Sequence, residues 1–319
     1  MLRASSISII LAVLLAPYFV SRWQSDARQV RVFSNDAPAR QETITSLKIL
    51  TYNIAHGRGP TGGNWDGPVA ADRERIDQIA ELIRRHNPDV VVLNEVDFNS
   101  TWSGHQNQAA AIAEQAGYSY RMEQRNFDLR FLYGSWKFGN AVLSRLPIVD
   151  ADSIEYPVFS RWEHVLVGSK QGCLCTLQIS PSQQVRIVPV HLEVRSEETR
   201  VASVNEIIQV ANRSTLPTVF AGDFNSSPAS FPLARQTAAG RNAMDLLASS
   251  RVVRIPEAAV ADAQPTTQEM TFTSTEPDRV IDWILPSSHF ACEDYQVLNV
   301  ELSDHRPVLA KLRLRPSAD

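Results

Sequence analysis

Residues 90–93 read Val-Val-Val-Leu, and the polar pair Asn94-Glu95 follows at once. Continuous apolar runs of this kind are typical of strands that are buried on both faces. The residues before the run carry isoleucines at helical spacing, and the pair Asn87-Pro88 is expected to end that helix. A strand covered on both sides needs a layered structure, so this stretch already points away from a single exposed sheet.

The other apolar patterns of the sequence indicate which strands and helices form these layers. Other strands are expected over residues 47–54, 141–144, 174–179, 185–192, 218–221, 280–285 and 308–314, and further helices over 106–116, 197–212 and 244–248. Strand–helix–strand crossovers and hairpins alternate in this order. We therefore expect an α/β fold in which two mixed sheets pack face to face with helices on the outside.

The N-terminal residues are expected to lie outside the fold. Arg3 precedes an apolar run, Ile7–Val20, which is shorter than the roughly 20 residues that a spanning helix needs. It suits the apolar core of a signal peptide, although bulky residues crowd the exit and leave an uncleaved anchor as the alternative. We expect residues 1–23 to be a signal peptide or membrane anchor, with residues 24–45 as a linker. The protein is then exported or membrane-anchored.

Net charge and cysteine content limit which binding partners and which metal sites the chain can have. The formal net charge of -4 gives no global attraction to nucleic acid or anionic lipid, although a local basic patch remains open. The cysteines, Cys173, Cys175 and Cys292, have no zinc-site spacing. Buried apolar roles are favoured for them over a disulfide.

Polar side chains gather at the ends of the expected strands. The positions are Asn53, Glu95, His191, Asp223 with Asn225, Asp282, and Asp304 with His305. Each has a purely structural alternative when taken alone; Asp223 and Asn225 fit an Asx turn, for example, and Asp282 could pair with Arg279. Taken together, on strands that converge in one architecture, they indicate a single site.

The chemistry that fits these residue types is metal-assisted attack of water on a phosphoester. Glu95 supplies a carboxylate for a hard cation, with Asn53 beside it, and Mg²⁺ prefers such oxygen ligands. Glu95, Asp223 and Asp304 are expected to converge without enough nearby Lys or Arg to neutralise them. A divalent cation is therefore expected as cofactor, Mg²⁺ with Mn²⁺ as the alternative.

The other residues are expected to handle protons. Asp223 can orient and deprotonate the water, and Asn225 can hold that water or a phosphate oxygen. His191 and His305 can donate hydrogen bonds to the phosphate or a proton to the leaving group. Asp282 is the expected partner that fixes the tautomer of His305 and raises its pKa.

Seven segments in order resemble the motifs of the endonuclease/exonuclease/phosphatase superfamily, the DNase I-like fold. They are residues 51–54, 93–97, 139–145, 191–193, 222–225, 279–283 and 303–308, and the resemblance runs from about 46 to 315. It implies a domain over 46–315 with a four-layer α/β sandwich and Mg²⁺-dependent phosphoester hydrolysis. It also implies that Asp304 lies near the metal or orients His305. The one departure is Asn94, where Gln is more usual.

The resemblance leaves the substrate open. His191 resembles the DNase I and sphingomyelinase branches more than the abasic-site repair branch. We expect a monomeric phosphodiesterase that acts outside the cytoplasm on a small or lipid phosphodiester; the alternatives are a DNase I-like endonuclease and a catalytically silent binding module. The aromatic and basic stretch 118–139 could stack on nucleic-acid bases, contact a membrane, or pack its own rings.

Overall fold

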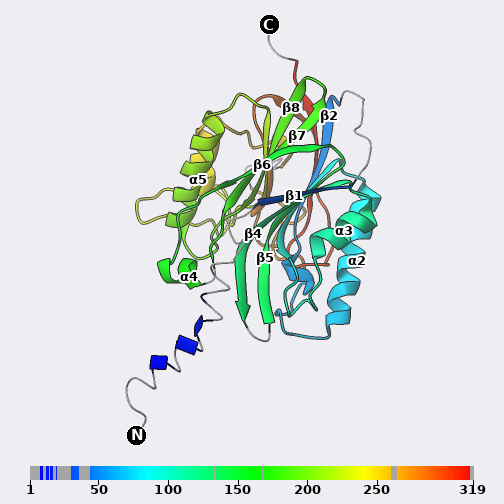
Figure 1. Cartoon of the computed structure of the whole chain (residues 1–319). Helices are drawn as coiled ribbons and strands as arrows, with labels where there is room; N and C mark the ends of the chain where they lie inside the picture. Colours follow the sequence, from blue (N-terminus) through cyan, green and yellow to red (C-terminus); the bar gives the residue numbers. More distant parts are fainter. Residues whose placement is uncertain are drawn as a thin grey trace.

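A computed structural model describes residues 30–35, 44–131, 134–166, 168–259 and 264–316, with a few single positions between 8 and 19. Two mixed sheets make up its centre (Figure 1). The larger sheet has the order β1 (Val30–Ser34), β4 (Tyr120–Phe131), β5 (Gly134–Ser144), β3 (Val90–Asp97), β2 (Ser46–Asn53), β12 (Val308–Leu314) and β11 (Phe290–Val297). The smaller has the order β10 (Asp282–Pro286), β9 (Thr218–Asp223), β8 (Gln183–His191), β7 (Gly172–Ser180) and β6 (Ile148–Ile154).

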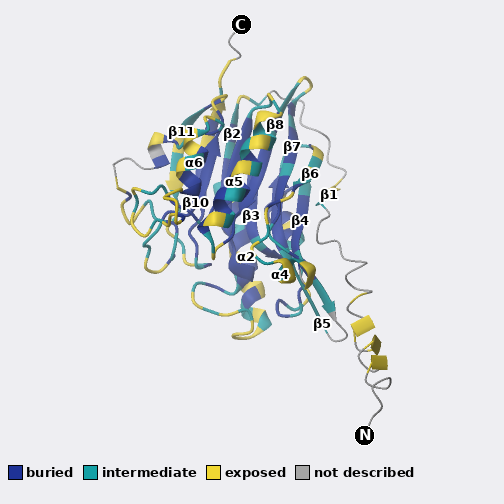
Figure 2. Ribbon diagram, turned by 90° about the vertical axis from the view of Figure 1, so that its left-hand side faces the viewer, coloured by how far each residue is buried: buried dark blue, intermediate teal, exposed yellow. Residues whose placement is uncertain are grey.

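Helices cover the outer faces of both sheets. The α-helices are α2 (Val69–His86), α3 (Gln108–Ala116), α4 (Arg161–Leu166), α5 (Glu197–Asn212) and α6 (Ala243–Ser249), with short 3-10 turns at Ala55–Gly57 and Glu257–Ala259. One apolar core lies between the sheets and includes Cys173 and Cys175. A second core joins the larger sheet to α2 and α3, and a third joins the smaller sheet to α5 and α6. Figure 2 shows these strands buried and the outer side of α5 exposed. The expected four-layer α/β sandwich is confirmed.

Strand direction brings the polar strand ends to one edge of the sandwich. β2 and β3 run parallel, with Asn53 opposite Asn94, and β8 and β9 run parallel, with His191 opposite Asp223. β10 is antiparallel to β9 and begins at the same level, with Asp282 opposite Asp223. We call this end of the sandwich, marked by Asn53, Glu95, His191 and Asp223, the site edge.

Some elements differ from expectation. Part of the expected linker, Val30–Ser34, forms strand β1 and pairs antiparallel with β4 at the rim of the larger sheet. Such edge strands are short and carry little periodicity, so their pairing is hard to read from sequence. The stretch 118–139 is mostly the hairpin of β4 and β5, which pair antiparallel and extend past the site edge. Strands β6 and β11 were not expected.

The N-terminal prediction cannot be compared with the structure, because most of residues 1–23 lie outside the described residues. Within the described part of the chain, no helix is long and apolar enough to cross a membrane. All three cysteines are free, and Cys173 and Cys175 are buried.

The backbone is crowded on two sides at Gly222 in β9. A Cβ atom there would lie 1.9 Å from the Val190 carbonyl oxygen of the neighbouring strand and 3.0 Å from Asn94 Oδ1 of the other sheet. The Gly222 φ of +142° also belongs to a region that disfavours side chains. The backbone amide of the next residue, Asp223, donates to the Asn94 side chain at 3.0 Å. Gly222 is therefore required by close contact as well as by conformation.

We expect Gly222→Ala to lower the free energy of unfolding by at least about 2 kcal/mol, since both the clash and the backbone strain oppose it. Gly240→Ala is the matched control: Gly240 also has a positive φ, +70°, but no atom lies within 4 Å of the point where an added Cβ would stand. It should cost on the order of 1 kcal/mol. Urea unfolding of the two variants measures the difference, and equal losses would contradict the steric argument.

Candidate active site

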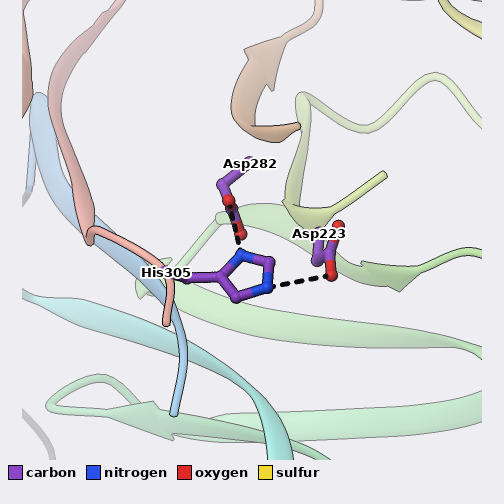
Figure 3. Close-up of side chains that lie close together, drawn as sticks. All are labelled: Asp223, Asp282 and His305. Atoms are coloured by element: carbon purple, nitrogen blue, oxygen red, sulfur yellow. Dashed lines mark hydrogen bonds and ion pairs between the residues drawn. The ribbon is translucent and has the colours of Figure 1, made fainter. Parts of the chain in front are cut away.

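Three side chains form the most compact cluster at the site edge. His305 directly precedes the loop into β12, and its Nδ1 lies 2.8 Å from Asp282 Oδ2 (Figure 3). Its other ring nitrogen, Nε2, lies 3.8 Å from Asp223 Oδ2. All three are buried. One carboxylate oxygen of each aspartate and one ring nitrogen of His305 lie within 4.8 Å of one another. Arg279 pairs with Asp278 instead of Asp282. The structure thus places Asp282 on His305, as the sequence predicts.

The charges in this cluster set its protonation. Burial opposes the charged form of His305, but Asp282 and Asp223 outweigh it and raise its pKa to about 10. Burial raises the pKa of Asp223 to about 6, against the attraction of His305. At neutral pH His305 is therefore an imidazolium that can donate a hydrogen bond or a proton. Asp223 titrates close to neutrality, in the range where a general base works best.

Asp223 is held by two asparagines, Asn53 and Asn225. Asn53 Nδ2 donates to Asp223 Oδ2 at 3.1 Å from the opposite sheet. Asn225 donates through its backbone amide to Oδ1 at 2.8 Å and through Nδ2 to Oδ2 at 3.2 Å. Asn225 adopts a left-handed conformation, with a φ of 49°, which Asn tolerates better than most residues. The Asx turn expected as a structural alternative is present, and it orients the same carboxylate.

His191 contacts a lysine that the sequence did not single out. Lys170 Nζ lies 2.7 Å from His191 Nε2 and donates to the Leu192 carbonyl at 2.6 Å. Burial, then the charge of Lys170, lowers the pKa of His191 well below its usual value. His191 is therefore neutral, and its Nε2 accepts from the ammonium. Lys170 stands in a loop before β7, where no periodicity or motif could have marked it.

Glu95 is positioned by a third histidine of the site, His56. Its φ is 53°, an unusual backbone conformation, and Oε2 lies 3.4 Å from His56 Nε2. His56 Nδ1 in turn contacts Asp97 Oδ1 at 2.9 Å, and Trp102 donates to the other oxygen of Asp97 at 2.6 Å. Burial opposes ionisation of Glu95, but the positive potential from His56 and nearby cations lowers its pKa to about 2. Glu95 is ionised at every pH of interest.

Asp304 pairs with Arg58. The distance from Arg58 Nη2 to Asp304 Oδ2 is 2.8 Å, and Asp304 Oδ1 lies 4.0 Å from His305 Nε2. Two cations that the sequence did not single out, Arg58 and Lys170, therefore reach the site, but neither lies at ion-pair distance from Glu95. Arg58 comes from the Gly-rich loop after β2, and its contact spans 246 positions of sequence. A contact between residues so far apart leaves no pattern in the local sequence from which it could be predicted.

Comparison with known proteins agrees with this geometry. The model of the endonuclease/exonuclease/phosphatase family matches residues 50–305. The chain belongs to this family. Members are generally phosphoester hydrolases. No match is found among curated proteins.

Solved structures of the family share the fold. One from Beutenbergia cavernae is 23% identical, with a TM-score of 0.64, and the match covers 86% of this chain and 74% of that one. The human Nocturnin catalytic domain with bound sulfate is 19% identical, with a TM-score of 0.58 and coverage of 92% and 99%. A mannosyl-6-phosphatase from Bacteroides thetaiotaomicron is 18% identical, with a TM-score of 0.57 and coverage of 85% and 100%.

Family members typically use divalent metals, and the donor set here fits such an ion. Glu95 is ionised, its side chain is 24% exposed, and its ion-pair contacts among the described residues are only to histidines. Asn53 and Asp304 add oxygen donors at the same edge. The compact cluster of Asp223, Asp282 and His305 suits a hard cation less well, because His305 is protonated and its Nδ1 is held by Asp282.

Proposed function

We propose that this chain is a divalent-metal-dependent phosphodiesterase that acts outside the cytoplasm on a small or lipid phosphodiester. The observation that supports the proposal best is the contact between a protonated histidine, His305, and a carboxylate that can accept a proton, Asp223. An imidazolium held by Asp282 stands 3.8 Å from Asp223, a carboxylate whose pKa is about 6. An acid and a base poised in this way can act on the two sides of a hydrolysis.

The roles follow from the contacts. Asp223, oriented by Asn53 and Asn225, accepts a proton from the attacking water. His305 donates to a phosphate oxygen as negative charge builds there, and Asp282 keeps its ring oriented. The neutral His191, with Lys170 against it, adds a cationic hydrogen-bonded pair whose His191 Nε2 lies 3.7 Å from the same Asp223 oxygen.

A bound divalent cation would neutralise charge on the phosphate and on the leaving oxygen. Glu95, Asn53 and Asp304 are the residues that we propose to hold it.

The hairpin of β4 and β5 supports a small or lipid substrate over a polyanion. Its arginines are already paired: Arg121 with Glu123 at 2.8 Å, and Arg125 and Arg130 with Asp128 at 3.5 and 3.1 Å. Nucleic-acid binding needs cations that neutralise phosphates along the strand. Because Glu123 and Asp128 engage these arginines and the net charge is -4, the surface beside the site offers less to a long polyanion than a basic groove would.

The direction of β1 supports action at a membrane. β1 is antiparallel to β4, with Val30 opposite Gln124, so the chain enters the domain at the level of the site edge. If the apolar segment Ile7–Val20 is kept as an anchor, the nine residues before Val30 span at most about 30 Å. Trp162 in α4, 78% exposed, lies near the same edge and suits a membrane interface. We propose that the anchored domain presents its site edge to the bilayer.

The purified protein is expected to hydrolyse bis(p-nitrophenyl) phosphate with Mg²⁺ or Mn²⁺ and to lose this activity in excess EDTA. Activity on choline phospholipids or small phosphodiesters should exceed that on duplex DNA at near-physiological salt, where binding to a polyanion weakens. Rates on a panel that also includes single-stranded DNA, RNA and inositol phosphates decide the matter. Full activity in EDTA would exclude metal dependence, and preferred cleavage of DNA would favour the endonuclease.

We expect His305→Ala to lower kcat on that aryl phosphodiester by a factor on the order of 10²–10³, because a donor to the developing charge is removed. Asp282→Asn should act in the same direction but more mildly, since the imidazole stays and loses only its charged partner. The exposed His289 provides the control, His289→Ala, which should leave kcat unchanged. Thermal melts check the folding of each variant. A folded His305→Ala enzyme with near-normal kcat would contradict the acid role of His305 and leave the pair of Lys170 and His191 as the donor.

Fractionation of cells that express the full-length chain is expected to place it in the membrane or outside the cytoplasm. Replacing two leucines of the apolar run, Leu14 and Leu15, by Arg should shift the protein to the cytoplasm, because charges disrupt both signals and anchors. A native chain recovered in the soluble cytoplasmic fraction with Met1 intact would contradict the proposed location.

A further inference from the structure

A cavity of about 160 Å³ lies beside the site edge. It is bounded by the β4–β5 hairpin, the loop that leads into α4, and the start of α5, which lie near one another in Figure 1. Its wall includes the aromatic side chains Phe127, Phe138, Tyr156 and Phe159. None of the roles proposed above uses this cavity.

The size and lining of the cavity favour a single ring. Phe127 and Phe138 stack with their centroids 4.8 Å apart and their planes at 16°. The Arg195 guanidinium, which also lines the cavity, lies 4.3 Å from the centre of the Phe159 ring. An apolar cavity of about 150 Å³ in another protein binds benzene, so the volume here is sufficient for one six-membered ring.

The cavity adjoins the reacting groups on two sides. Lys170 is part of its wall, and its Nζ lies 2.7 Å from His191 Nε2. On the other side, the Phe138 ring meets the His56 ring edge-on at 4.8 Å, and His56 contacts Glu95. A substituent on a phosphate that binds in front of His191 and Glu95, which lie 3.8 Å apart, is therefore within reach of the cavity.

The charges around the cavity balance. Arg195 donates to Glu193 at 2.7 Å and to Glu163 at 2.9 Å, so one guanidinium holds both carboxylates of the wall. Lys170 supplies the second positive charge. With two Glu against one Arg and one Lys, these side chains attract neither a cation nor an anion. A quaternary ammonium would meet the Lys170 ammonium without a free carboxylate to offset it.

We propose that this cavity binds one ester group of the substrate and that the group is an uncharged six-membered aromatic ring. The inference rests on the proposed phosphodiesterase function, since it assigns the cavity to a substituent of the same phosphate. Stacking on Phe127 and Phe138 and the loss of water from the ring would supply the binding free energy.

Calorimetric titration with phosphonates tests the proposal separately from turnover, because ester hydrolysis does not cleave the carbon–phosphorus bond. The probes are phenylphosphonate, methylphosphonate and 2-(trimethylammonio)ethylphosphonate, each added to the full chain with Mg²⁺. Phenylphosphonate is expected to bind at least about tenfold more tightly than methylphosphonate, as burial of one ring allows. The trimethylammonio probe should gain nothing over methylphosphonate.

Three variants locate the effect. Val158→Trp fills the cavity from a half-buried loop position and should abolish the preference for the phenyl probe. Phe127→Leu removes the stack and should reduce it. Phe33→Leu, on β1 and outside the cavity wall, is the matched control and should retain it. Melting curves confirm that each variant is folded.

Equal affinity for the phenyl and methyl probes, tighter binding of the trimethylammonio probe, or a phenyl preference that survives in both Val158→Trp and Phe127→Leu would overturn the inference. The proposed function fails on a different result, the absence of hydrolysis across the substrate panel. A protein that hydrolyses phosphodiesters without the phenyl preference keeps its function and loses the aromatic-ring site. One that binds the phenyl probe in a Val158-dependent way keeps the site even if the panel is negative.

Discussion

The site depends on one buried amide that joins the two sheets. Asn94 Nδ2 donates to Asn140 Oδ1 at 2.8 Å in its own sheet and to the Val190 carbonyl at 3.0 Å in the other. Its Oδ1 accepts from the Asp223 backbone amide at 3.0 Å. Asn94 is fully buried, so any of these groups left unpaired would cost the desolvation of a polar atom. Because Glu95 follows Asn94 and Asp223 bonds to it, the same amide fixes the spacing between the proposed metal carboxylate and the proposed base.

The balance of charge at the site edge explains how several carboxylates share a buried space. Asp304 is neutralised by Arg58, Asp282 by the imidazolium of His305, and Asp97 by contact with His56. Like Asp223, Glu95 has only histidines at ion-pair distance among the described residues, but its side chain is 24% exposed whereas that of Asp223 is 2% exposed. A cation that binds there would meet the positive potential of His56 and Lys170. Its affinity would consequently be lower than that of a bare acidic cluster, which favours an ion that exchanges with solvent.

How much of this could be predicted from sequence depends on the kind of signal. Apolar strands that end in polar residues indicated the site edge, and the α5 bounds, Glu197–Asn212, follow from its periodicity. The contact of Asp282 with His305 could be predicted because both stand beside buried strands of the same edge. Arg58, Lys170 and the pairing of β1 could not. The first two lie in irregular loops, and β1 is a short edge strand whose partner is about 90 residues away. The positions of Arg58, Lys170 and β1 are determined only by tertiary contacts, which leave no pattern in the local sequence.

The same topology explains why function gathers at one end of the molecule. Two parallel pairs, β2 with β3 and β8 with β9, both finish at the site edge, and β10 and β12 begin there. Strands that end at a common edge release their loops together, which is where open α/β sheets bind ligands. The β4–β5 hairpin and the loop before α4 extend past that edge and build the aromatic cavity against it. Chemistry is thus set by residues that the sheets fix rigidly, whereas substrate choice falls to the loops and the hairpin beyond. Sequence similarity across the family would then be expected to identify the reaction more readily than the substrate.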